Sequence, residues 1–273
     1  MSGRSYSSPA YRYGFNGQEK DDEVSGSGNT NTAEYWEYDC RLGRRWNLDP
    51  KPNPSLSSYA CFGNNPVWVS DPKGDTLRMA LGQSKEFIAA TNTALEKLKT
   101  TKEGFLIYND LQNSDQVFTM REKTAEDVAA NFFSPQYKTV INYQTGKTEL
   151  KPNGGEIVWN IEGSDVPVQQ NSKSIFSKME KSGLFSFAHE LGHAEDQSQG
   201  KFYKLNQEIK KGLKESEWSA SHKENMIRAE LNAPLRTHYY VTTNGKSFPP
   251  PLLKLTNKGI ESKYQKGFFY THF

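Results

Sequence analysis

Residues 187–197 read FAHELGHAEDQ, and this stretch holds two of the five histidines of the chain, His189 and His193, four positions apart. Apolar residues in and just before the stretch predict a helix with one buried face: Leu184, Phe185, Ala188 and Leu191. Residues four apart lie on the same side of a helix, with Cβ atoms about 5–6 Å apart. The two imidazoles are therefore placed to bind one metal ion together.

The residue types of this stretch favour zinc. Imidazole is an ordinary zinc ligand, and Glu190 projects beside the pair, where its carboxylate can accept a proton from a water molecule without binding the metal. The alternative is a solvated helix with two surface histidines. The apolar residues argue against it, because a buried helix with two histidines needs partners for them. Gly192 would also let another segment approach closely.

A catalytic zinc ion normally has three protein ligands, and residues 214–240 contain the candidates for the third. Glu217 and Glu224 lie seven residues apart and share one face of a predicted helix, so either could supply the ligand. Glu230 would point away from that face. Ala220 is small enough to let this helix lie close to the metal. His222 and His238 are expected near the site as polar residues and not as ligands.

Four motifs resemble the glutamate-type zinc metallopeptidases that bacteria use as toxins, including the NleD-type effector peptidases. They are HELGH from His189, ExxA from Glu217, EN-IR-E from Glu224, and PLRTHY over 234–239. The resemblance implies that Glu217 is the third ligand and that Glu224 orients a ligand or the metal. Arg236 and Tyr239 form an RxxY pair like that of clostridial neurotoxin light chains, which implies that both face the oxyanion of the transition state.

The pattern of the second part of the chain predicts an α+β fold, and the resemblance implies a zincin-like one with a small mixed sheet. A helix is expected over 84–101, beginning at Ser84, and helices follow from Ser182 and over 214–232, with Pro234 as a stop. Strands are expected where β-branched and aromatic residues concentrate, at 105–111, 138–143 and 155–161. Residues 155–161, GEIVWNI, are expected at the sheet edge, and the tail 244–273 is expected to be extended.

Residues 1–75 are rich in turn pairs and aromatic residues, which predicts short strands. Three segments resemble the closing stretch of the RHS repeat-associated core: YRYGFNGQEKDDEV (11–24), YDCRLGRRWNLDP (38–50) and SLSSYACFGNNPVWVSDPKGD (55–75). Cys40 stands where that family usually has proline, and the repeat array that forms the enclosing shell is absent. We therefore expect an RHS tail segment at 1–75 and a zinc metallopeptidase toxin domain at 76–273.

Charge and composition exclude other classes. The chain has a net charge of +2, and residues 76–273 carry 26 Lys and Arg against 22 Asp and Glu, which is too little positive charge for a nuclease toxin. No apolar run reaches the ~20 residues of a membrane span. The N-terminus lacks the apolar segment of an ordinary signal peptide. Cys40 and Cys61 are either free or joined in one bridge.

The sequence thus predicts a Zn²⁺-dependent endopeptidase that cleaves a protein of a target cell. The toxin resemblance implies delivery by a dedicated bacterial export system and a cognate immunity protein. No nucleic-acid partner is expected. The alternative is a non-enzymatic RHS tail that serves delivery or assembly, with a structural metal or none. A structural zinc would need a fourth protein ligand, and no cysteine is near enough in the sequence to provide it.

Overall fold

The computed structural model describes most of the chain, and its contacts divide the chain into two units, Met1–Gly82 and Gln83–Phe273. The described residues are 12–14, 18–33, 36–48, 57, 59, 77–80, 82–114, 116–141, 147–171, 177–242, 247–248 and 251–270. The expected boundary at Asp75, the Asp71-Pro72 pair and Cys61 lie outside them. Cys40 is exposed and free.

The first unit contains a four-stranded antiparallel sheet of short strands in the order β1-β2-β3-β4. The strands are β1 (Glu19–Lys20), β2 (Thr30–Ala33), β3 (Trp36–Asp39) and β4 (Arg44–Arg45), and one helical turn, α1 (Asp22–Ser25), lies between the first two. Asp21 caps this turn by accepting a hydrogen bond from the Glu23 N–H. The described part of residues 1–75 is therefore rich in short strands and turns, as its sequence predicts.

The second unit contains a mixed sheet with the strand order β6-β8-β7. Its strands are β6 (Phe118–Glu122), β7 (Phe132–Ile141) and β8 (Thr148–Trp159), with β6 parallel and β7 antiparallel to β8. Strand β5 (Leu77–Met79) lies in the first unit. The prediction that GEIVWNI lies at the sheet edge is wrong, because it falls in β8, between two neighbours. Ile157, Val158 and Trp159 are consecutive and buried, which is the pattern of an interior strand.

The second unit begins with two consecutive helices, and the sequence predicts a strand for part of the second one. The predicted helix at Ser84 is confirmed as α2 (Lys85–Lys99), and the Ser84 hydroxyl accepts from the Phe87 N–H. The prediction of a strand at residues 105–111 is wrong, because these residues belong to helix α3 (Lys102–Gln112). Thr101 caps α3, and its buried residues recur at helical spacing, Gly104, Ile107 and Leu111.

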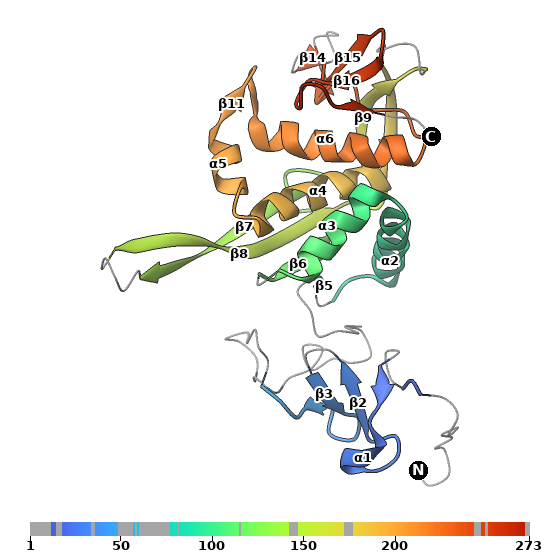
Figure 1. Ribbon diagram of the computed structural model, residues 1–273, viewed down its shortest axis with the longest axis vertical. Coiled ribbons are helices and arrows are strands. Elements are labelled where there is room, and N and C mark those ends of the chain that lie inside the picture. Colours follow the sequence, from blue (N-terminus) through green and yellow to red (C-terminus); the bar gives the residue numbers. More distant parts are fainter. Residues whose placement is uncertain are drawn as a thin grey trace. The chain divides into compact units, whose positions relative to one another are not determined.

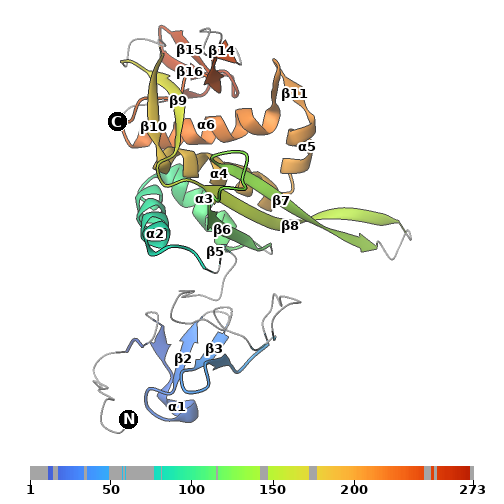
Figure 2. The same cartoon turned by 180° about the vertical axis from the view of Figure 1, so that it is seen from behind.

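Helix α4 (Gly183–Ser198) lies between the sheet and helix α6 (Glu215–Glu230), as Figures 1 and 2 show from opposite sides. The Trp159 ring of β8 stacks on Phe187 of α4 at a centroid distance of 4.6 Å. A Cβ at Gly192 would lie only 3.4 Å from the Ala220 Cα, so the expected close approach of the two helices at these small residues is confirmed. Helix α6 ends at Glu230, before Pro234.

The connection between the two helices holds α5 (Phe202–Gln207) and a short hairpin, β11 (Ile209–Lys210) and β12 (Leu213–Lys214). Two further hairpins are formed by β9 (Ser164–Gln169) with β10 (Ser177–Ser182) and by β13 (Tyr240–Val241) with β14 (Ser247–Phe248), and β13 contacts β9.

The C-terminal tail is more regular than the extended segment expected. It forms an antiparallel sheet of β15 (Leu253–Thr256), β16 (Gly259–Ser262) and β17 (Phe269–Tyr270). This tail sheet shares a hydrophobic cluster with Trp218 of α6 and with Leu235. The tail therefore packs as part of the unit that carries the histidine pair.

Candidate metal centre

The two histidines of α4 and one glutamate of α6 come together. The Nε2 atoms of His189 and His193 each lie 3.2 Å from Oε2 of Glu217. The candidate ligand atoms of the three residues all lie within 4.8 Å of one another. The structure thus brings together the ligand set expected from the sequence.

The dimensions of this cluster suit a tetrahedral zinc ion. Ligand atoms about 2.0–2.1 Å from zinc at tetrahedral angles lie about 3.3 Å from each other, close to the observed imidazole–carboxylate separations. Two imidazoles and a carboxylate are also a donor set that zinc accepts. Among the described residues, no fourth His, Cys, Asp or Glu joins this cluster.

Charge around His189 and Glu217 keeps the metal-free cluster paired. Burial alone would lower the pKa of His189, but hydrogen bonds with Glu217 and Glu224 raise it to about 9. Burial also opposes ionisation of Glu217, yet His193 and His189 hold the pKa of this carboxyl well below its ordinary value. A metal ion that binds Nε2 of His189 must therefore displace a proton, so metal binding is coupled to proton release.

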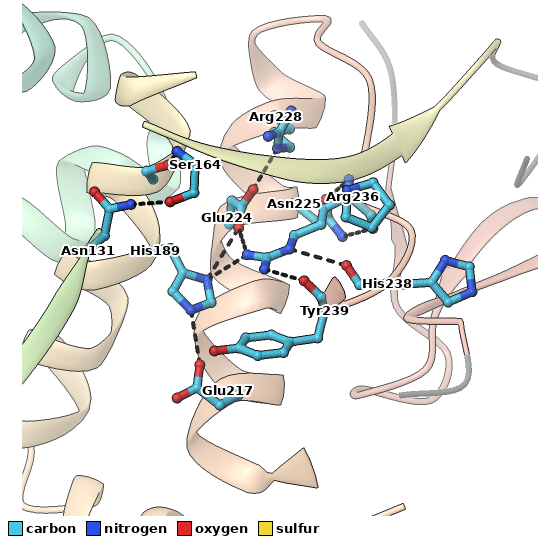
Figure 3. Close-up of polar contacts among 12 residues, drawn as sticks. Asn131, Ser164, His189, Glu217, Glu224, Asn225, Arg228, Arg236, His238 and Tyr239 are labelled. Atoms are coloured by element: carbon cyan, nitrogen blue, oxygen red, sulfur yellow. Dashed lines mark hydrogen bonds and ion pairs between the residues drawn. The ribbon is translucent and has the colours of Figure 1, made fainter. Parts of the chain in front are cut away.

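Glu224 lies behind His189 and not among the converging ligand atoms. Its Oε2 atom is 3.2 Å from His189 Nδ1, the nitrogen on the far side of the ring from Glu217, as Figure 3 shows. Arg228 donates to its Oε1 at 2.8 Å and Arg236 to its Oε2 at 2.7 Å. Only 1% of its side chain is exposed. These contacts fit the role of orienting a ligand better than that of the alternative ligand.

Glu190 is buried beside the histidine pair with a carboxylate that makes no hydrogen bond to the described residues. Burial raises the pKa of this carboxyl, while the neighbouring His189 and His193 oppose the rise. A carboxylate without a fixed partner next to a metal site is available to accept a proton.

The RxxY pair reaches the cluster from two directions. The Tyr239 ring centroid is 6.2 Å from that of His189, and its hydroxyl points to the Glu217 side in Figure 3. Burial and Glu217 raise the pKa of this phenol, so it keeps its proton at neutral pH. Arg236 instead lies on the Nδ1 side of His189, and it also donates to the Tyr239 carbonyl at 2.7 Å. The two side chains contact each other, since Cζ of Arg236 lies 5.0 Å from the centroid of the Tyr239 ring, but the guanidinium is bound to Glu224.

Three residues around the site were not singled out from the sequence. Arg228 binds Glu224, Glu180 at 2.8 Å and the Pro234 carbonyl, and its position four residues after Glu224 on one helix was a usable signal. Asn225 holds the main chain of Arg236 by accepting from its N–H at 2.6 Å and donating to its carbonyl at 2.9 Å. The side-chain amide of Gln197 lies one turn beyond His193.

Comparison with family models, with curated proteins and with solved structures gave no match. No helix among the described residues is both long and apolar enough to cross a membrane.

Proposed function

We propose that this protein is a zinc-dependent endopeptidase with a zincin-like catalytic unit. The observation that carries the proposal is the convergence of His189, His193 and Glu217 beside the buried carboxylate of Glu190. The close helix packing at Gly192 and Ala220 supports it, because it brings the two ligand-bearing helices to the distance that one small ion requires.

Each residue has a distinct task in the proposed hydrolysis. When bound by His189, His193 and Glu217, zinc would supply a Lewis acid that lowers the pKa of water to about 7. Glu190 accepts the proton of the attacking water and delivers it to the leaving amine. Tyr239 keeps its proton and donates a hydrogen bond from its phenol to the negative charge that develops on the carbonyl oxygen. Glu224, held by two arginines, accepts a hydrogen bond from Nδ1–H of His189 and so fixes the orientation of the His189 ring.

An extended substrate fits the edge strand β7 better than the interior strand β8. Strand β7 ends the order of the described sheet, so its outer edge can pair with a peptide main chain. A chain of aromatic contacts joins this strand to the site. The ring of Phe133 in β7 lies 5.3 Å from Phe202, and Phe202 lies 5.5 Å from His193.

The biological role follows from the two resemblances. We propose that the enzyme is the toxin part of an RHS-type protein, delivered into a target cell, where it cleaves a protein and where an immunity protein protects the producer. The test is metal analysis of the purified full chain together with cleavage of proteins in a target-cell lysate. Cleavage that requires zinc and is absent in Glu190→Gln supports the proposal. A metal-free wild-type chain, or cleavage that persists in Glu190→Gln, contradicts it.

A further inference from the structure

The last turns of α4 contain three buried polar atoms without a hydrogen-bond partner among the described residues. They are Nδ1 of His193, Oδ2 of Asp196 and Oε1 of Gln197. All three residues are at least nine-tenths buried, with 5%, 3% and 0% of their surface exposed. Buried polar atoms are usually paired, so an unpaired donor and an unpaired acceptor within five residues call for an explanation.

The His193 atom is a donor in the metal-binding state. Its Nε2 atom faces Glu217 and the proposed zinc position. A neutral imidazole that binds a metal through Nε2 carries its proton on Nδ1. A buried N–H without an acceptor is costly, and metal-bound histidines almost always donate this proton to a neighbour. His189 has such a neighbour in Glu224, so His193 requires one of its own.

Gln197 is suited to supply that acceptor. It lies four residues after His193 and therefore on the same face of α4. Its Nε2 atom donates to the carbonyl of Gln136 at 2.8 Å and to that of Gly154 at 3.3 Å. Turning the amide over would place its oxygen against these two carbonyls, so the contacts fix Oε1 as the free acceptor.

The carbonyl of Gln136 is available because the register of β7 with β8 shifts between Pro135 and Tyr137. The Gln197 amide is thus anchored on the sheet at this irregularity, at a fixed position relative to α4. Because the anchor is backbone, Oε1 is held in place, and since it is not hydrogen-bonded to His193 Nδ1 in this structure, the His193 ring must shift toward it when the metal binds.

Asp196 is the rival acceptor, but its surroundings tie it to another group. Lys223 donates to its Oδ1 at 2.8 Å and to the Gly192 carbonyl at 3.0 Å, and it pairs with Glu195 at 2.6 Å. This charged cluster lines a polar pocket of about 600 Å³ that also contains Glu103.

We propose that Gln197 is the positioning residue of His193, with its Oε1 atom accepting the Nδ1 proton and its amide nitrogen anchoring the pair to strands β7 and β8. The inference rests on the proposed metal site. The two ligand histidines are then held by different chemistry, His189 by a carboxylate between two arginines and His193 by a neutral amide fixed to the sheet.

The first experiment compares zinc affinity, measured by competition with a chelator, in the full chain and two variants. Gln197→Met should weaken zinc binding by about 10- to 100-fold. Gln116→Met is the matched control, because Gln116 is another buried amide at the same junction. It accepts from the Gly154 N–H at 3.0 Å and donates to the main-chain carbonyls of Gln197 at 3.3 Å and Ser198 at 2.8 Å, so it touches the backbone of Gln197 but not its side-chain amide. Its zinc affinity should fall by less than about tenfold.

The absorption spectrum of the cobalt-substituted chain gives a second readout, since a change in the orientation of His193 alters the ligand field, whereas a general loss of stability does not. Equal zinc affinities and equal cobalt spectra in the two variants would overturn the role of Gln197. A wild-type chain that binds no zinc would overturn the metal site itself, and the inference with it.

The second experiment needs no variant. A crystal structure of the zinc-loaded wild type should show His193 Nδ1 within hydrogen-bond distance of Gln197 Oε1. An Nδ1 atom that instead contacts Asp196 would overturn the inference while leaving the metal site intact.

Discussion

Two buried histidines, one on helix α4 and one on helix α6, have surroundings that differ in charge. His189 of α4, 5% exposed, faces the carboxylates of Glu217 and Glu224. His222 of α6 itself, 7% exposed, faces the tail sheet, where its Nδ1 atom is 2.6 Å from the Tyr270 hydroxyl and its Nε2 atom is 3.1 Å from the Gln265 side-chain oxygen. The two residues are equally buried, so burial cannot distinguish them.

Their partners do. Burial lowers the pKa of His222 to about 4, because its neutral partners offset little of the cost of a buried charge and Lys223 adds to it. The same burial is outweighed at His189, where two carboxylates raise the pKa to about 9. The comparison shows that the charge of the partners, and not burial alone, sets the direction in which the pKa of a buried histidine moves.

The largest effect on activity is expected from a substitution beside His189, the histidine with charged partners. Glu190→Gln keeps the shape of the side chain but removes the proton acceptor, so hydrolysis should fall by about 10²- to 10⁴-fold. Bound zinc and the thermal unfolding midpoint should stay close to those of the wild type. Activity within about tenfold of wild type would exclude Glu190 as the general base.

The charged network around His189 and the neutral network around His222 should also differ in how much the free energy of unfolding falls when one member is removed. Arg228→Met removes a fully buried cation from Glu224 and should lower the free energy of unfolding by about 3–5 kcal/mol. On the neutral side, Tyr270→Phe removes the hydroxyl next to His222 and should cost about 1–3 kcal/mol. Urea unfolding of the metal-free chains measures both values. Equal costs would erase the distinction between the networks.

Tyr239→Phe should lower kcat by about 10²-fold or more with little change in KM, because the phenol donates its hydrogen bond to the oxyanion only in the transition state. Tyr240→Phe is the control, since Tyr240 is 44% exposed. Steady-state kinetics on a cleaved peptide would measure both. A silent Tyr239→Phe beside a damaging Tyr240→Phe would mean that the RxxY assignment is displaced by one residue.

The smallest effect concerns pH. Because the pKa of His222 is about 4 in the folded chain and near 6.5 when unfolded, the unfolded chain takes up a proton first as pH falls. Stability from this residue is present above pH 6.5 and is lost as pH falls toward 4, by about 2 kcal/mol at pH 5. The raised pKa of His189 has the opposite sign in the metal-free chain, so its contribution is complete below pH 6.5 and disappears as pH rises through about 9.

Unfolding midpoints in urea at a series of pH values would test this prediction. The decline between pH 6.5 and 5 should be weaker in His222→Gln than in wild type, since glutamine does not titrate. An equal decline in both chains would assign the acid sensitivity to other groups.

Local sequence was sufficient for the features that depend on neighbours along one element. The histidine pair of α4 and the cap at Ser84 are of this kind, because the spacing of four residues and the side chain just before a helix are both read along one helix. It failed for residues 105–111, where aromatic and β-branched residues suggested a strand although Thr101 caps a helix. Propensity is a weak guide when a cap and a buried helical face oppose it.

The position of Arg236 could not be read from local sequence, because it depends on a distant strand. Main-chain hydrogen bonds of 2.8 Å join Gln169 of β9 to Leu235 and Thr237 to Pro167 of β9, and these fix the segment that carries Arg236. The surroundings of His222 are likewise supplied by residues of the tail sheet far along the chain.

The most direct test of the central claim is the zinc content of the purified full chain and of two glutamate variants. The wild type should bind one zinc ion per chain. Glu217→Gln should lose it, because the variant removes a ligand. Glu224→Gln should retain it with an affinity lower by about 10- to 100-fold, because it alters only the partner of His189. If Glu224→Gln loses the metal while Glu217→Gln keeps it, the ligand assignment is wrong. If the wild type itself binds no zinc, the claim of a metal centre fails.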